Sequence, residues 1–329
     1  MQLKGIHHVT AITSSAEKIY DFFTNVLGLR LVKKTVNQDD IDTYHLFFAD
    51  DLGSPGTDMT FFDFKGISKA VHGNNELNRT GFRVPNDKSL EYWLKRFNHY
   101  KVKHSEIKTM FGKKIIEFED FDGQLYALIS DELNSGVNSG TPWKNGPVPD
   151  HFAITGLGPI YINVSRLDGI NTILTEIFLM RQTKVENNYY LYEMGEGGNG
   201  ASLIINYQQN NKPSYQGYGA IHHIAFRVGN KEDLSNWQER LDKFGAPNSG
   251  YVDRFYFKSV YTRLYLNVLF ELATDEPGFI DDEETYINLG ETLALPPKFR
   301  NNRAYIEKVV RHIDTVRSNK VFEKEYFNE

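Results

Sequence analysis

The sequence predicts an α+β protein made of four βαβββ modules, which pair into two domains and are followed by a C-terminal helical tail. An internal repeat is the main observation. Phe82-Arg83-Val84 recurs 144 residues later as Phe226-Arg227-Val228, and Leu125–Leu128 aligns with Leu269–Leu272 at the same offset. The length of 329 residues agrees with two domains, because one domain usually takes roughly 100–200 residues.

The first module, near residues 4–66, shows the pattern of elements most clearly. Ile6–Ile12 alternates as a strand does. Ser14 with Glu17 three residues later forms a capping box that predicts the start of a helix, and Gly28 stands where that helix should end. Three β-rich segments, separated by Asp, Gly and Pro, complete the module: Leu29–Val36, Tyr44–Ala49 and Asp58–Phe64.

The other modules are predicted near residues 76–133, 155–208 and 218–275. The third shows a strand, a helix and two further strands: Ile160–Val164, Leu167–Met180, Tyr189–Glu193 and Ala201–Tyr207. A segment rich in Gly, Asn, Ser and Pro, Asn134–Pro149, is typical of a linker. We therefore expect one domain over residues 1–135 and a second over 150–280, with two modules in each.

The remaining residues, 281–329, form the tail. Its acidic run, Asp281–Glu284, lacks the spacing of a calcium loop, so a solvated surface segment is the better interpretation. Asn301–Val316 has the spacing of an amphipathic helix, which we expect to pack across the body of the protein.

Composition excludes several classes of function. The chain carries 43 acidic and 37 basic side chains, a formal net charge of −6, so it lacks the basic surface that binds nucleic acid. With no cysteine, any metal must be held by histidine and carboxylate. Residues 1–13 lack the basic start and the apolar run of a signal peptide, so we expect none. No apolar run approaches the ~18 residues of a membrane span. We expect a cytoplasmic protein with no membrane partner, and a homo-oligomer is compatible with the sequence.

Two paired histidines stand out among the ten in the chain. His7-His8 and His222-His223 each lie in a strand that opens a module, and the strand period places His8 and His223 on the more polar, ligand-facing side. The same period turns His7 and His222 toward an apolar face. The other six stand alone and are interpreted as surface or capping residues: His45, His72, His99, His104, His151 and His312.

A carboxylate strengthens the case for a site. Glu271 lies in an otherwise apolar strand, where an ionised group is costly unless it is paired or bound to a metal. At the repeat offset, Ala127 aligns with Glu271 and Arg79 with His223, so the scaffold folds without these side chains. Two imidazoles and one carboxylate form the facial triad that suits Fe(II), and Mn(II) or another divalent ion fits the same ligands. We predict His8, His223 and Glu271 as metal ligands, which requires the first and fourth modules to lie side by side.

Arg254 and Tyr261 are candidates for the surroundings of this site. At the repeat offset they align with Met110 and Glu117, so they have no functional counterpart in the other copy. A guanidinium can stabilise a phenolate oxygen, and a tyrosine hydroxyl can hydrogen-bond to a substrate. An exposed ion pair and a half-buried core tyrosine are the structural alternative.

The module plan, together with Gly5–Thr10, Ala220–Phe226, Asp253–Tyr261 and Leu269–Phe279, resembles the vicinal oxygen chelate superfamily. Within it, these stretches are most similar to the hydroquinone-type ring-cleaving dioxygenases. The resemblance implies that each pair of modules forms an open, curved, mixed sheet flanked by helices. It also implies an Fe(II) enzyme that binds a small aromatic diol through one phenolic oxygen and opens the ring with O2.

Carried over residue by residue, the resemblance implies that Thr10, His222, Arg254 and Tyr261 surround the three ligands, with His222 as the proton carrier. That role conflicts with the strand period, which turns His222 toward the apolar face, unless a twist or a bulge redirects it.

The leading interpretation is an Fe(II)-dependent ring-cleaving dioxygenase acting on a hydroquinone or catechol, in aromatic or quinone detoxification. One alternative is a metal isomerase or thiol transferase of the glyoxalase or fosfomycin-resistance kind, which uses the same modules without O2. A glyoxalase site would generally need a fourth protein ligand or a second carboxylate as base, and the strand Met59–Phe64 offers only Asp63 for either role. The other alternative is a protein that binds an aromatic ligand without turnover, which leaves Glu271 unexplained.

Overall fold

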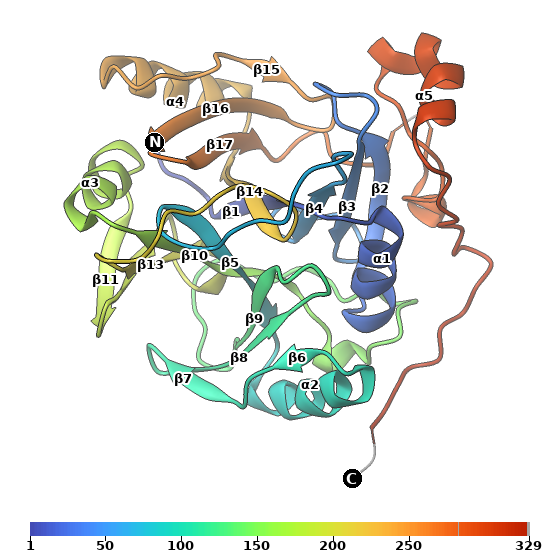
Figure 1. Ribbon diagram of the computed structural model, residues 1–329, viewed down its shortest axis with the longest axis horizontal. Coiled ribbons are helices and arrows are strands. Elements are labelled where there is room, and N and C mark those ends of the chain that lie inside the picture. Colours follow the sequence, from blue (N-terminus) through green and yellow to red (C-terminus); the bar gives the residue numbers. More distant parts are fainter. Residues whose placement is uncertain (282, 328–329) are drawn as a thin grey trace.

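Two mixed β-sheets form the body of the protein, and the longer helices lie at its periphery (Figure 1). The computed structural model describes residues 1–281 and 283–327. The first sheet has the strand order β15-β16-β17-β14-β1-β4-β3-β2, and the second has the order β11-β12-β13-β10-β5-β9-β8-β6, with β7 paired to β8. The predicted α+β class with two mixed sheets and flanking helices is confirmed.

The strands have the following bounds. Those of the first sheet are β1 (Ile6–Ile12), β2 (Arg30–Val36), β3 (Tyr44–Ala49), β4 (Asp58–Phe62), β14 (Ala220–Val228), β15 (Val252–Asp253), β16 (Lys258–Tyr265) and β17 (Val268–Thr274). Those of the second sheet are β5 (Glu76–Val84), β6 (Lys103–His104), β7 (Lys108–Met110), β8 (Lys113–Glu119), β9 (Leu125–Ser130), β10 (Gly156–Val164), β11 (Arg181–Glu186), β12 (Tyr189–Glu193) and β13 (Ser202–Tyr207).

The helices are short. The α-helices are α1 (Ala16–Asp21), α2 (Asp87–Tyr100), α3 (Leu167–Thr172), α4 (Lys231–Lys243) and α5 (Arg303–Val309). Single π-helical turns, Phe22–Val26 and Ile173–Ile177, extend α1 and α3. The 3₁₀ turns are Asp150–Phe152, Asn199–Ala201, Tyr286–Asn288 and Pro297–Asn302. None of the helices in the described ranges has both the length and the apolar character needed to cross a membrane.

The modules pair differently from their order in the chain. β1 pairs antiparallel with β14, so the first and fourth modules share one sheet, and β5 pairs with β10, so the second and third share the other. Each sheet therefore takes strands from both sides of the predicted linker at residues 134–149, and the two predicted domains do not coincide with the two sheets. The first and fourth modules nevertheless lie side by side, as the predicted site requires.

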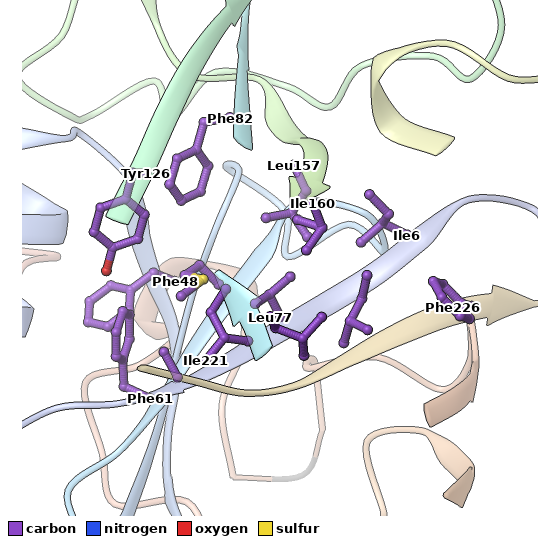
Figure 2. Close-up of a cluster of buried hydrophobic side chains, with 14 of the residues drawn as sticks. Ile6, Phe48, Phe61, Leu77, Phe82, Tyr126, Leu157, Ile160, Ile221 and Phe226 are labelled. Atoms are coloured by element: carbon purple, nitrogen blue, oxygen red, sulfur yellow. The ribbon is translucent and has the colours of Figure 1, made fainter. Parts of the chain in front are cut away.

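A continuous apolar core joins the two sheets. Figure 2 shows Ile6 and Phe226 of the first sheet in the same buried cluster as Leu157 and Ile160 of the second. Because side chains alternate along a strand, the burial of Val9 in this core turns the neighbouring residues of β1 to the opposite face of the sheet. That face is left for the polar groups described below.

The first helix begins one residue later than the sequence indicates. Ser15, rather than Ser14, is the N-cap, and its hydroxyl accepts a hydrogen bond from the amide of Lys18. Ser14 instead donates to the carboxylate of Asp122 in the second sheet's modules. Gly28 has a φ of +69°, so the predicted left-handed end of this segment is confirmed.

The tail differs from its prediction in two ways. Its helix ends at Val309, and the chain beyond it runs on without helix or strand (Figure 1). Ile313 and Thr315 in this stretch are buried. The acidic run is not a solvated segment: Glu284 is 1% exposed and accepts a hydrogen bond of 2.7 Å from the buried amine of Lys33. Residue 282 of that run, and residues 328–329 of the tail, lie outside the described residues.

Candidate metal centre

The three predicted ligands converge on one face of the first sheet. His8, His223 and Glu271 come from β1, β14 and β17, which are neighbours in the sheet. Oε2 of Glu271 lies 3.1 Å from Nε2 of His8 and 3.0 Å from Nε2 of His223, and the two Nε2 atoms are 3.3 Å apart. The Glu271 side chain is completely buried. The adjacency of three strands thus brings His8 to two side chains that lie more than 200 residues further along the chain.

These three atoms have the arrangement of donors around one cation. Ligands at about 2.1 Å from a metal, and at right angles to one another, are about 3.0 Å apart. Oε1 of Glu271 accepts a 2.5 Å hydrogen bond from Ser259, whereas Oε2 has no hydrogen-bond partner in the described part of the chain. Burial opposes ionisation, but the neighbouring imidazoles hold the pKa of the Glu271 carboxyl well below its usual value. A divalent ion would satisfy the free electron pairs.

His7 fixes the tautomer of His8. Nε2 of His7 lies 3.0 Å from the carbonyl oxygen of Thr274, which can only accept, so this nitrogen carries the proton. Burial lowers the pKa of His7 to about 3, which keeps its ring neutral and leaves Nδ1 as an acceptor. Nδ1 of His8, 2.9 Å away, must then be the donor. In a neutral His8 ring, Nε2 then keeps its lone pair on the side of Glu271, as a metal ligand requires.

Two bulges bring the first histidine of each pair beside the second. Ile6 pairs with Phe226 and His8 with Ala225, so His7 is an extra residue on β1. In the same ladder, Thr10 pairs with His223 and Ala11 with Ile221, so His222 is the extra residue on β14. A bulge redirects its side chain, and the predicted strict alternation fails at both positions for this reason.

His222 reaches the site by its bulge. Its Nδ1 lies 2.8 Å from Nδ1 of His223, which repeats the contact between His7 and His8. Burial lowers the pKa of His222 to about 3, so the ring is neutral. The side chain also lines the cavity beside the triad.

A cavity of about 430 Å³ opens onto the triad. Its volume lies in the usual range of small-molecule sites. His8 and His223 form part of its wall. The apolar lining residues are Val36, Phe47, Phe62, Phe64, Phe257 and Leu269, and the polar ones include Asn37, Gln38, Asp39, His45, His222, Arg254 and Tyr261.

Arg254 and Tyr261 lie together in this cavity. Tyr261 faces Glu271 across the β16–β17 ladder, and its hydroxyl accepts a 3.1 Å hydrogen bond from Nε of Arg254. The same guanidinium donates to both carboxylate oxygens of Asp39, at 3.1 and 2.8 Å. Burial raises the pKa of Tyr261 far above its usual value, so the phenol keeps its proton.

Thr10 lies behind the triad rather than in the cavity wall. Its hydroxyl oxygen is 3.0 Å from Nε2 of His223 and 2.7 Å from the hydroxyl oxygen of Thr60. The structure therefore brings all seven predicted site residues into one neighbourhood.

Three residues of this neighbourhood do not emerge from the sequence pattern. His7 and Ser259 orient His8 and Glu271, as described above. The prediction that His45 is a surface or capping residue is wrong: its ring lies between Phe47 and Phe62, with centroid distances of 4.0 and 4.4 Å, and lines the cavity. The only indication in the sequence that His45 faces the cavity is its position two residues before Phe47 in the same strand.

Comparisons with known proteins agree with this fold and site. Residues 5–128 match the family model of the glyoxalase/bleomycin resistance protein/dioxygenase superfamily. MhqA of Bacillus subtilis (strain 168), named as a ring-cleaving dioxygenase, is 41% identical over 319 residues, which cover 95% of this chain and 100% of that protein. The chlorohydroquinone/hydroquinone 1,2-dioxygenase of Sphingobium indicum is 30% identical over 308 residues, covering 90% and 92% of the two chains.

Solved structures give the same picture. A Bacillus subtilis protein named as a dioxygenase superposes with a TM-score of 0.88 at 32% identity, over 96% of this chain and 99% of that one. Glyoxalase I from Zea mays superposes with a TM-score of 0.58 at 14% identity, over 82% and 92%, which shows the shared fold alone. The chain therefore belongs to the glyoxalase/bleomycin resistance protein/dioxygenase superfamily, also called the vicinal oxygen chelate superfamily, and groups there with relatives named as ring-cleaving dioxygenases.

Proposed function

We propose that the protein is an Fe(II)-dependent dioxygenase that opens the ring of a hydroquinone or catechol with O2. The observation that carries the proposal is the buried His8–His223–Glu271 triad, whose possible ligand atoms lie within 4.8 Å of one another beside a cavity of small-molecule size. Members of the superfamily typically bind a divalent metal, and the relatives' names supply the reaction class. Mn(II) or another divalent ion could occupy the same donors.

His8, His223 and Glu271 would hold the metal. Two neutral imidazoles and one carboxylate leave neighbouring coordination positions open on the cavity side. When bound there, Fe(II) would act as a Lewis acid for one phenolic oxygen of the substrate and would pass electrons from the substrate ring to O2.

The cavity wall would bind and orient the ring. Phe47, Phe62 and Phe257 offer aromatic surfaces on which a flat ring can pack, and they exclude water from the centre. Because the hydroxyl of Tyr261 accepts from Arg254, its own proton remains free to be donated to a substrate oxygen. The positive charge of Arg254 would favour the phenolate form of the substrate.

His222 would carry a proton. If Nε2 of His223 keeps its lone pair for the metal, then Nδ1 of His223 bears the proton and donates it in a hydrogen bond to Nδ1 of His222. In the neutral His222 ring, the proton then resides at Nε2. We propose that His222 carries a proton during ring opening: it gives the Nε2 proton to an oxygen of the opened ring and takes one back from the substrate hydroxyl that ionises, so the imidazole ends neutral.

The test is oxygen uptake by anaerobically reconstituted Fe(II) protein after addition of methylhydroquinone or catechol. We expect stoichiometric O2 consumption with a ring-opened product, its loss in His223→Ala, and its retention in His72→Ala, a histidine paired with Glu76 in the second sheet. Absence of uptake with any diphenol, in protein that retains its iron, would overturn the proposal. A thiol-adduct assay would then test the isomerase or transferase alternative.

A further inference from the structure

His45 occupies a position in the cavity that the proposed mechanism does not yet use. It lies on β3, and its ring is held between Phe47 and Phe62. Burial lowers the pKa of His45 well below its usual value, so the ring is neutral and offers one donor and one acceptor nitrogen. Such a ring can bind a hydroxyl group with either nitrogen.

One nitrogen of His45 is already occupied. Nε2 lies 2.9 Å from the hydroxyl oxygen of Thr60. That oxygen lies 2.7 Å from the hydroxyl oxygen of Thr10, which in turn is 3.0 Å from Nε2 of His223. Three hydrogen-bond lengths therefore separate His45 from the triad, and the imidazole is fixed in orientation.

The other nitrogen is free. Nδ1 of His45 has no hydrogen-bond partner within residues 1–281 and 283–327, and it is not among the buried polar atoms that lack one. The ring packs against both Phe47 and Phe62, and the side chain lines the cavity. Nδ1 is thus a polar atom of the cavity wall that is available to a ligand.

We infer that Nδ1 of His45 binds the hydroxyl group of the substrate ring that does not go to the metal centre. The inference rests on the proposed function, because it takes the first oxygen of the ring to lie at the triad. A hydroxyl can donate to Nδ1 or accept from it, so either tautomer of His45 serves. The ligand class is then a dihydroxybenzene, and His45 selects it over a monophenol, which would leave Nδ1 unpaired in the cavity.

A binding cycle tests this without turnover. Hydroquinone and phenol are titrated anaerobically into Mn(II)-loaded protein, with wild type and His45→Phe compared. Phenylalanine keeps the aromatic packing between Phe47 and Phe62 and removes only the nitrogens. We expect wild type to bind hydroquinone about tenfold more tightly than phenol, and His45→Phe to lose about tenfold for hydroquinone while its affinity for phenol changes less than twofold.

Thr60→Val is the second variant. It removes the anchor of Nε2 but keeps Nδ1, so we expect a smaller selective loss, of roughly threefold, for hydroquinone. Equal losses for both ligands, or no loss for either in folded variants, would overturn the inference. Failure of the proposed function has a different readout. It would appear as no O2 uptake by the Fe(II) protein, even if hydroquinone binds selectively.

Discussion

Replacement of His7 by phenylalanine tests whether the bulged histidines prepare the metal centre. His7 is 3% exposed, accepts from Nδ1 of His8 and donates to the carbonyl oxygen of Thr274. Phenylalanine has a similar shape but leaves both partners unpaired. Loss of a group that orients a metal-bound histidine typically lowers metal affinity by about 10–100-fold, or about 1.4–2.7 kcal/mol. Each unpaired buried group also lowers the free energy of unfolding by about 1–3 kcal/mol.

The two effects of His7→Phe are measured separately. Competition titration with Mn(II) gives the dissociation constant, and urea unfolding without metal gives the stability of the scaffold. We expect His7→Gln, whose amide can accept and donate in the same two directions, to recover part of the affinity, and the exposed His99→Phe to change neither quantity. Mn(II) affinity within twofold of wild type, in folded His7→Phe, would refute the tautomer argument.

Three further substitutions test other buried polar groups. Asp58 is buried, and neither carboxylate oxygen has a hydrogen-bond partner among the described residues. Burial raises the pKa of Asp58 well above 3.8, so the native state loses stability as pH rises above about 4, by up to about 1.4 kcal/mol per pH unit. Asp58→Asn should therefore raise the urea midpoint at pH 8 and not at pH 4, and an equal gain at both would contradict this. Ser259→Ala should weaken Mn(II) binding about tenfold, because it removes the hydrogen bond that holds Oε1 of Glu271. Metal titration measures this loss, with Ser249→Ala as the control. Glu284→Gln should lower the free energy of unfolding, measured in urea, by about 3–5 kcal/mol, because it removes one of the two carboxylates paired with the buried amine of Lys33. If the pair acts as a unit, the double variant with Lys33→Met should recover most of that loss.

The sequence predicts the triad because its signals are local. A histidine pair in an alternating strand, and a glutamate in an apolar one, are visible without knowledge of the partners of those strands. The roles of His7, His222 and His45 are different, since they depend on where one strand slips against another or on which side chains cover a ring. Pairing of the modules is equally long-range: linker composition marks a division of the chain, but the ladder between β1 and β14 joins segments from both sides of it.

The repeat explains why, in the described part of the chain, the candidate metal cluster lies in the first sheet and has no counterpart at the equivalent positions of the second. In the second sheet, Arg79 and Ala127 occupy the positions of His223 and Glu271, and Glu117 occupies that of Tyr261. Arg79 pairs with Glu117 and lies over the ring of Tyr161, so the charges at these positions neutralise each other within the protein. In the first sheet, the same positions hold a carboxylate next to two imidazoles, and no lysine or arginine pairs with that carboxylate among the described residues. A bound cation completes that balance, which is the physical reason to expect metal in one copy and an internal ion pair in the other.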